Sequence, residues 1–463
     1  MSGGMKKMKK RTVSFPRFYG VDNSAHGNAG GALYAEGSYN FDMNDGSLRQ
    51  GLGAEYAYNL SLPEKCVALY FYRRDDALSG EDDRIIILGT SGKLYQKKIS
   101  SGSFAQISGV TFSSRPIGVC YNYNGEDVMI FANADDGAYV YDGSAITPIP
   151  SAPPITSACI HYERLFATSD GGKTLWFSDD FDPANWSISL TEAGFIDLGG
   201  FRGELLKAVS FLDHVYVFRS YGITRVSAYG DQTQFSVSDL FVSSGKILRD
   251  SITFCGDRII FAATDGFYVF DGISATRILG GLDGTVNFSK EEIKGKFFNG
   301  KAYFTVYVKR GNSNIRSVLV YDLKSGSYYL SEGHVVYDIE LIDGRSVYDL
   351  YFLSTAGTRL YRFNSSGKNL STSLYKRWKS KACDFGVRKS NKIMTELSLY
   401  TETDITVTVD NGTQSAAYAI CGGKGRKTVR PNIKGENFSV EIFCGGAEAN
   451  VSGLTMKFAY YDE

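Results

Sequence analysis

Short apolar runs bounded by Gly, Asp, Asn or Ser fill most of the chain. Residues 128–132 and 302–308 are typical: each is an alternating or fully apolar run that ends at a group of turn-forming residues. This is the pattern of β-strands joined by tight turns. Helical periodicity is nearly absent, and its strongest window, residues 289–297, is one short amphipathic piece. The pattern therefore predicts an all-β protein.

One unit recurs along the chain. It contains an apolar strand, a Gly/Asn/Asp turn, a second apolar strand, a turn with Gly, an aromatic-rich third strand and a weaker fourth strand. The two best copies align on their DG-x-YV-[YF]-DG segments, residues 136–143 and 265–272. Looser copies bring the total to about seven units at a spacing of roughly 40–50 residues, the period of four-stranded propeller blades. The copies begin at Cys66, Pro116, Ile155, Leu206, Asp250, Ile293 and Val335.

Seven contiguous, evenly spaced units favour a β-propeller, because stacking around an axis buries the faces that one blade leaves open. The DG pairs are expected at blade hairpins, where a positive φ is needed. A run of separate β-sandwich domains is the rival interpretation. The predicted fold is all-β: a propeller of about seven blades, with an N-terminal arm and a C-terminal sandwich-like domain.

Three regions follow from this pattern. Residues 1–60 form a basic N-terminal arm and a lead-in strand, residues 61–370 form the propeller, and residues 371–463 form a C-terminal antiparallel β domain. The last region alternates differently from the blades and predicts a small sandwich, with added strands at the propeller edge as the alternative. Whether a strand near residues 39–48 closes the last blade stays open from the sequence.

Composition narrows the class of protein. The chain has 463 residues, 43% of them hydrophobic, which excludes a disordered chain. High Gly (51), Tyr (31) and Phe (30) with only nine Pro suit strands and tight turns. The seven Cys form no CxxC pair, so neither a disulfide framework nor a zinc site is expected. The basic N-terminus lacks a following apolar region, and no run approaches the roughly 18 apolar residues that a membrane helix needs.

Charge is partitioned although the formal net charge is +0. Residues 1–30 carry six Lys or Arg against one Asp, and residues 371–463 carry 13 against 10, so these ends are +5 and +3. The remaining body, with 31 against 39, is −8. A neutral chain is not a globally basic nucleic-acid binder. Basic ends on an acidic body are a pattern that suits self-assembly, with solvated surface charge as the plain alternative.

Most candidate chemistry fails on spacing. The four His are far apart in the sequence, and their spacing predicts no three-ligand metal site. No GxSxG, HExxH or P-loop motif occurs. The segment TSDGGKTLW, residues 168–176, resembles the Asp-box turn of sialidase-type propellers, with Leu175 where that motif has Trp. Catalysis in that family needs an arginine trio, a Tyr nucleophile and an acid, which no spacing here identifies. We therefore expect no metal, no cofactor and no enzymatic activity, and keep a sialidase-like glycosidase as the least favoured alternative.

Basic stretches at the two ends are candidate docking sites. The stretch at residues 376–392 interleaves Trp378 and Phe385 with cations, so it suits an acidic protein face or nucleic acid, or it is a solvated strand face. The candidate docking residues are Lys6, Lys7, Lys9, Lys10, Arg11, Lys376, Arg377, Lys379, Lys381, Arg388, Lys389 and Lys392.

Three segments carry a family resemblance. YNFDMNDGSLRQGLG, residues 39–53, looks like an N-terminal passage of large β-propeller virion proteins of tailed phages, in which an early strand precedes the first blade. RLFATSDGGKTLWFSDDFDPANW, residues 164–186, is similar to a recurring motif of the same proteins. Residues 379–412 resemble their post-propeller sandwich, which a Lys-rich strand with a D-F-G turn opens. By length and layout the chain resembles the tail nozzle, or tail-hub packaged-DNA stabilisation protein, of short-tailed phages.

That resemblance implies a virion structural protein made in the host cytoplasm. It implies a ring homo-oligomer, with a hexamer as one possibility, at the head–tail connection below the portal and adaptor. The ring is part of the conduit for DNA ejection and retains packaged DNA, which passes without sequence-specific binding. The alternative is a receptor- or glycan-binding propeller on a tail or cell surface. It predicts exposed aromatics on one face, with Trp176, Trp186 and Tyr221 as the candidate ligand contacts.

Overall fold

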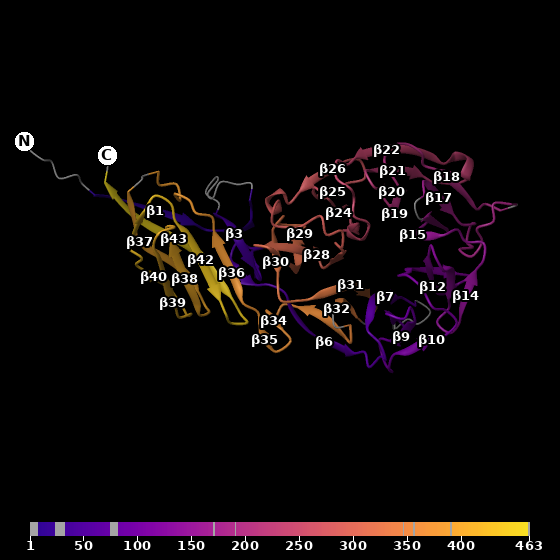
Figure 1. Cartoon of the computed structure of the whole chain (residues 1–463), viewed down its shortest axis with the longest axis horizontal. Helices are drawn as coiled ribbons and strands as arrows, with labels where there is room; N and C mark the ends of the chain where they lie inside the picture. Colours follow the sequence, from indigo (N-terminus) through magenta and orange to yellow (C-terminus); the bar gives the residue numbers. More distant parts are fainter. Residues whose placement is uncertain are drawn as a thin grey trace, which may run out of the picture.

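A computed structural model describes residues 8–23, 33–74, 82–169, 172–189, 191–345, 347–354, 357–388 and 391–461. The described elements are β-strands, apart from three single-turn 3-10 helices. The strands form a ring of sheets with a smaller two-sheet domain beside it (Figure 1). This confirms the predicted all-β propeller. The helices are η1 (Gln232–Gln234), η2 (Arg249–Ser251) and η3 (Gly280–Leu282).

Six blades of the propeller are sheets of four consecutive antiparallel strands, and they match the sequence repeats in order. Blade 1 is β7 (Cys66–Tyr72), β8 (Arg84–Gly89), β9 (Leu94–Lys98) and β10 (Ala105–Ile107); blade 2 is β11 (Ile117–Tyr123), β12 (Glu126–Asn133), β13 (Gly137–Tyr141) and β14 (Ile146–Ile149); blade 3 is β15 (Ile155–His161), β16 (Arg164–Ser169), β17 (Thr174–Phe177) and β18 (Gly194–Asp197). Blade 4 is β19 (Leu205–Phe211), β20 (His214–Arg219), β21 (Gly222–Ser227) and β22 (Ser236–Val242); blade 5 is β23 (Thr253–Phe254), β24 (Ile259–Ala263), β25 (Gly266–Phe270) and β26 (Ala275–Ile278); blade 6 is β27 (Gly295–Phe298), β28 (Lys301–Arg310), β29 (Ser313–Asp322) and β30 (Tyr328–Ser331).

The seventh blade takes its fourth strand from the N-terminal side of the propeller. Its strands β31 (Val336–Asp343), β32 (Tyr348–Ser354) and β33 (Arg359–Asn364) are followed in the sheet by β6 (Gly53–Asn59). β33 and β6 pair in an antiparallel register from Arg359 with Asn59 to Asn364 with Gly53. The short strands β34 (Lys368–Asn369) and β35 (Thr372–Ser373) extend this sheet. The strand that closes the ring therefore lies just after the segment 39–48 for which the question was open.

The blades are built as their sequence pattern requires. The second strands β8 and β16 are buried along their whole length, because the neighbouring blades cover both faces of each sheet. The glycines of the predicted DG hairpins, Gly143 and Gly272, have φ values of +95° and +96°. Such values are readily adopted only without a Cβ atom, which explains the glycine at both turns.

Two further sheets form the sandwich-like domain, and both chain ends contribute to it. The larger sheet contains β1 (Met8–Phe15), β4 (Phe41–Asp42), β5 (Leu48–Gln50), β37 (Lys392–Thr401), β40 (Arg426–Val429), β41 (Ile433–Gly435) and β43 (Asn450–Tyr461). The smaller contains β2 (Phe18–Val21), β3 (Leu33–Tyr39), β36 (Lys376–Ser380), β38 (Ile405–Asp410), β39 (Ser415–Ile420) and β42 (Ser439–Cys444). In β38 the alternation of Ile405, Val407 and Val409 with polar residues places the apolar side chains in the shared core.

The N-terminal region does not stand apart from these domains. β1 pairs with β43 along its whole length, from Met8 with Tyr461 to Phe15 with Leu454. Strands β1 to β5 thus belong to the sandwich and β6 to the propeller. The predicted region 1–60 is therefore shared between the two domains over its described residues.

Asn40 joins the sandwich to blade 6 and to the chain after blade 7. Its side chain is 4% exposed and its φ is +61°. The Nδ2 atom donates to the Tyr375 carbonyl at 2.8 Å, and Oδ1 accepts from the Glu332 backbone N–H at 2.7 Å. The ion pair of Lys301 with Asp42, 3.0 Å long, lies at the same junction. Strand β30 packs against β2, β3 and β4, so the two domains form a continuous body.

The junction predicts a measurable loss for Asn40→Ala. Alanine leaves the Tyr375 carbonyl and the Glu332 N–H buried without partners and adopts a positive φ less readily than Asn. We expect a loss of about 3 kcal/mol in the free energy of unfolding, from roughly 1–3 kcal/mol per unsatisfied group. Urea unfolding followed by Trp fluorescence measures it. Asn40→Gly keeps the backbone conformation and should lose less, and equal midpoints for wild type and Asn40→Ala would contradict this role.

Candidate functional site: the axial cavity

The innermost strands of the blades enclose a cavity of about 490 Å³. Its wall comes from blades 1 to 4, 6 and 7 and from η2 before blade 5, so residues far apart in sequence meet there. Most of the charged wall residues lie on or just before a first strand, as Arg115 before β11, Lys207 in β19 and Asp338 in β31 do. The charged residues of the wall are Arg115, Asp135, Lys207, Arg249, Asp250, Lys294, Lys296, Asp338 and Glu340.

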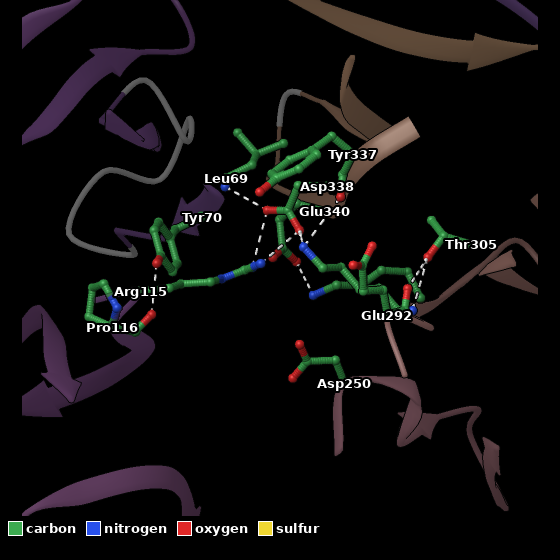
Figure 2. A network of polar contacts seen from close by, with 12 residues as sticks. Leu69, Tyr70, Arg115, Pro116, Asp250, Glu292, Thr305, Tyr337, Asp338 and Glu340 are labelled. Atoms are coloured by element: carbon green, nitrogen blue, oxygen red, sulfur yellow. Dashed lines mark hydrogen bonds and ion pairs between the residues drawn. The ribbon is translucent and has the colours of Figure 1, made fainter. Parts of the chain in front are cut away.

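Asp338 is the centre of a network of polar contacts (Figure 2). Its side chain is 1% exposed, and its carboxylate accepts from Arg115 at 3.0 and 3.1 Å, from Lys294 Nζ at 2.8 Å and from the Leu69 N–H at 2.8 Å. Burial raises the pKa of Asp338, but the charges of Arg115 and Lys294 outweigh burial and hold the pKa below its ordinary value. The network ties blades 1, 6 and 7 and the segment before blade 2 together.

The other cations of the wall differ in their partners. Lys296 pairs with Glu340, and Arg249 lies 3.3 Å from Asp250. Lys207 instead donates to a neutral acceptor, the Ile252 carbonyl, at 2.9 Å. Burial in the cavity, followed by the positive charge of Lys296, lowers the pKa of Lys207 to about 8. Lys207 is therefore the cation that this wall stabilises least.

The cavity does not supply the constellation that the sialidase alternative needs. Its described wall contains two arginines, Arg115 and Arg249, and each is engaged by an aspartate. The Tyr70 hydroxyl donates to the Pro116 carbonyl at 2.7 Å, and burial raises the pKa of Tyr70 far above its ordinary value. A tyrosine held in this way is a poor nucleophile.

The structure separates the candidate docking residues into two groups. Lys9, Lys10 and Arg11 are exposed on β1, and Arg388 is exposed after the D-F-G turn. Others lie on the surface of the sandwich with local partners, as in the 2.8 Å pair of Arg377 with Glu441. Lys379 lies 3.7 Å from Glu36, Lys381 is half-buried, and Lys6, Lys7 and Lys389 are outside the described residues.

Lys376 and Lys392 are buried and must be removed from the docking set. Both are 0% exposed. Lys376 Nζ donates to the Leu374 and Gly446 carbonyls, and Lys392 Nζ donates to the Val387 carbonyl at 2.6 Å. The alternation of side chains along a strand indicates this burial. Lys376 lies on the same face as buried Trp378, and Lys392 lies on the same face as buried Met394. These lysines satisfy backbone carbonyls inside the sandwich.

The three candidate ligand-contact aromatics occupy different environments. Trp186 is 4% exposed and its Nε1 donates to the Pro183 carbonyl at 3.0 Å. Trp176 is half-buried against Phe195 on blade 3, with 5.2 Å between the ring centroids. Tyr221 is 43% exposed in the turn between β20 and β21. The buried Trp186 cannot contribute to an aromatic face that binds glycans.

Comparisons with known proteins identify no family and no function. No protein-family model matches the chain, and no curated protein matches it. Similar solved structures include the computationally designed Ika8 protein (12% identity, TM-score 0.43, covering 67% of this chain and 100% of that chain) and BBS1N in complex with ARL6DN (12%, 0.43, 69% and 99%). YCF48 from Cyanidioschyzon merolae is another (10%, 0.36, 55% and 96%). Likenesses of this size support no argument about activity or partners.

Two searches of the described residues complete this picture. Within that part of the chain no three His, Cys, Asp or Glu side chains gather in a way that could hold a metal ion. The described residues also include no long apolar helix that could cross a membrane.

Removing the central carboxylate should be costly. Asp338→Asn leaves Arg115 and Lys294 partly buried without their counter-charge, and we expect a loss of about 3–5 kcal/mol in unfolding free energy. Because the pKa of Asp338 is lowered, its contribution is complete above the ordinary value of 3.8 and is lost as the pH falls through the folded-state pKa. Urea unfolding between pH 3 and pH 7 measures both effects. Asp257→Asn, at an exposed pair with Arg258, is the control. Equal losses for the two variants would refute the network.

Lys207→Met should have the opposite effect. The lowered pKa of Lys207 means that the unfolded chain binds more protons between pH 8 and pH 10.5, so wild-type stability rises across this window. The variant lacks the cost of the buried charge and should be more stable at pH 7, by on the order of 1–3 kcal/mol at about 1.4 kcal/mol per pKa unit. The gain should vanish above pH 10.5, and Lys246→Met at an exposed pair should show none. A destabilised Lys207→Met protein at pH 7 would contradict this.

Proposed function

We propose that this chain is a structural protein of a phage virion, a tail nozzle or hub subunit that assembles as a ring. The ring forms part of the DNA exit conduit below the portal and adaptor and retains packaged DNA. One observation carries the proposal: the three segments that resemble this family occupy, in order, the link between sandwich and propeller, blade 3 and the sandwich. A resemblance spread over the link, a blade and the sandwich concerns the arrangement of the whole chain.

The first segment, residues 39–53, connects the sandwich to the propeller. It contains Asn40, whose side chain joins the domains, and it ends at Gly53, where the closing strand β6 begins. A Cβ atom on Gly53 would collide with the Asn364 side chain and lie 2.9 Å from the Lys368 carbonyl oxygen. The glycine is needed because β6 passes between β33 and β34 at this point.

The second segment, residues 164–186, shapes blade 3. Arg164 is 6% exposed and pairs with Asp180 at 2.7 Å, and Trp186 closes the long turn by packing into the core between blades 2 and 3. The third segment, residues 379–412, begins in the Lys-rich strand β36 and continues into the D-F-G turn. There Phe385 has a φ of +50°, is fully buried and packs against Phe15, with 5.8 Å between the ring centroids. The resemblance implies a post-propeller sandwich that opens with such a strand and turn, and this segment supports the proposal.

Electrostatics suits a conduit made between copies better than one through the propeller. The axis of each propeller holds a network that joins the segments around it, whereas a ring of copies leaves a lumen at its centre. The acidic body, residues 31–370 with a net charge of −8, repels DNA phosphates, so DNA in that lumen would slide without sticking.

The test is assembly with the head–tail connector. The purified chain is mixed with portal and adaptor proteins of a short-tailed phage, and the products are examined by negative-stain imaging and native mass measurement. We expect a ring of this chain below the adaptor, with a mass that is an integral multiple of 50.9 kDa added to the connector. Portal without adaptor is the control, which should recruit less of the chain. A monomer that never joins the connector would overturn the proposal.

A further inference from the structure

The turns between the first and second strands of the blades provide an internal comparison. In blades 2 and 6 these turns are Asn124–Gly125 and Asn299–Gly300, with φ values of +54° and +84°, and of +49° and +77°. Asn-Gly is the preferred pair for such two-residue hairpins, because both positions need a positive φ. The fold itself therefore accepts the least strained sequence at this position.

Blades 3 and 4 place large apolar residues at the same position. Tyr162 and Leu212 have φ values of +50° and +45°, a conformation that costs a residue with a bulky side chain roughly 1–2 kcal/mol. Their side chains remain 45% and 55% exposed, so burial recovers only part of that cost. Backbone strain retained for exposed apolar side chains is characteristic of contact surfaces.

Other exposed apolar side chains surround these two at the same end of the blades. The connections between first and second strands and between third and fourth strands lie at one end of a four-stranded meander. Tyr229 lies 5.8 Å from the Tyr162 ring, and Phe254 shares with Tyr162 and Leu212 a depression of about 330 Å³. Phe181 donates its backbone N–H to the Glu163 carbonyl at 3.2 Å. We name Tyr162, Phe181, Leu212, Tyr229, Phe254 and Ile273 the turn cluster; its members are 45–75% exposed.

Carboxylates surround the turn cluster. In the turns at this end of blades 3 to 5, residues 162–163, 178–193, 212–213, 228–235, 255–258 and 271–274, the only Lys or Arg is Arg258, which pairs with Asp257. Arg164, at the start of β16, pairs with Asp180 and Glu192, and the other carboxylates leave the surface acidic. The carboxylates of these turns are Glu163, Asp179, Asp180, Asp182, Glu192, Asp213, Asp231, Asp257 and Asp271. An acidic surface with exposed aromatics suits a partner that is basic and carries apolar side chains.

The chain itself presents such a partner on β1. This strand lies at the edge of its sheet, paired on one side with β43, and it exposes Met8, Lys9, Lys10 and Arg11. The sandwich with β1 and blade 3 with β15 to β18 lie at opposite ends of the molecule (Figure 1). The two surfaces therefore cannot meet within one copy, but they can meet between copies.

We propose that the turn cluster of one copy binds the basic edge strand β1 of a second copy, head to tail. Such contacts repeat from copy to copy and close into a ring when the rotation allows it. The inference rests on the proposed function, because it names the surfaces that would join the ring subunits. It also places the exposed basic residues of β1 against an acidic surface of the same protein.

The decisive variant is Tyr162→Asn combined with Leu212→Asn, which installs the residue found in blades 2 and 6. Relief of strain should leave the urea midpoint equal or higher, while self-association, measured by sedimentation velocity over a concentration series, should weaken at least tenfold. Tyr221→Asn is the matched control: Tyr221 is 43% exposed at the other end of blade 4 and should leave association unchanged. A double variant that associates like wild type overturns the proposal.

Charge reversal tests the partner. Glu163→Lys and Lys10→Glu should each weaken association several-fold, and the two variants mixed with each other should recover it, because the reversed pair again attracts. Failure of the mixture to recover overturns β1 as the partner. A wild-type chain that joins the connector but stays monomeric alone at every concentration sinks this inference and leaves the proposed function standing. A chain that self-associates through these surfaces but never joins the connector overturns the proposed function and leaves this inference standing.

Discussion

Ring closure is the constraint on which the rest of the structure depends. Three strands of blade 7 follow blade 6 in sequence, and the fourth position is filled by β6 from before blade 1. Without β6, strand β33 would expose the backbone groups that now pair from Arg359 to Asn364. An open edge of this kind is unstable and prone to association. Joining the two ends of the propeller in one sheet makes the ring continuous.

Closure also determines where the chain ends lie. The segment before β6 and the segment after β33 leave the same blade, so both emerge next to each other, and both enter the sandwich. This explains why β1 pairs with β43, although 434 residues lie between Phe15 and Asn450. It also explains why Asn40 contacts both Glu332 and Tyr375, one on each side of blade 7. The sandwich is thus built from the two chain segments that leave the closing sheet at the same end.

Sequence reasoning succeeded where the signal is local. Blade number and the positive-φ glycines follow from short runs and DG pairs, because each blade repeats a pattern that adjacent residues define. It missed pairings that depend on distant partners, such as β6 with β33 and Asp338 with Arg115. The prediction that Lys376 and Lys392 are docking residues is wrong for another reason. The net charge of a stretch does not show which face of a strand each residue occupies. The spacing of Lys376 and Trp378, two residues apart on one strand, places both side chains on the same face.

Two groups of residues stand out because they lower the stability of the fold and the propeller architecture does not require them. In the axial cavity the cost is electrostatic: Asp338 offsets it for Arg115 and Lys294 with short, buried hydrogen bonds, while Lys207 has only a carbonyl. In the turns of blades 3 and 4 the cost is conformational, and nothing within the described residues covers Tyr162 and Leu212 enough to offset it. The first cost is repaid inside the molecule by joining segments around the axis. The strain in the turns is not offset by any contact among the described residues of one copy. An interaction with another molecule therefore explains the sequence of these outer turns better than it explains the axis.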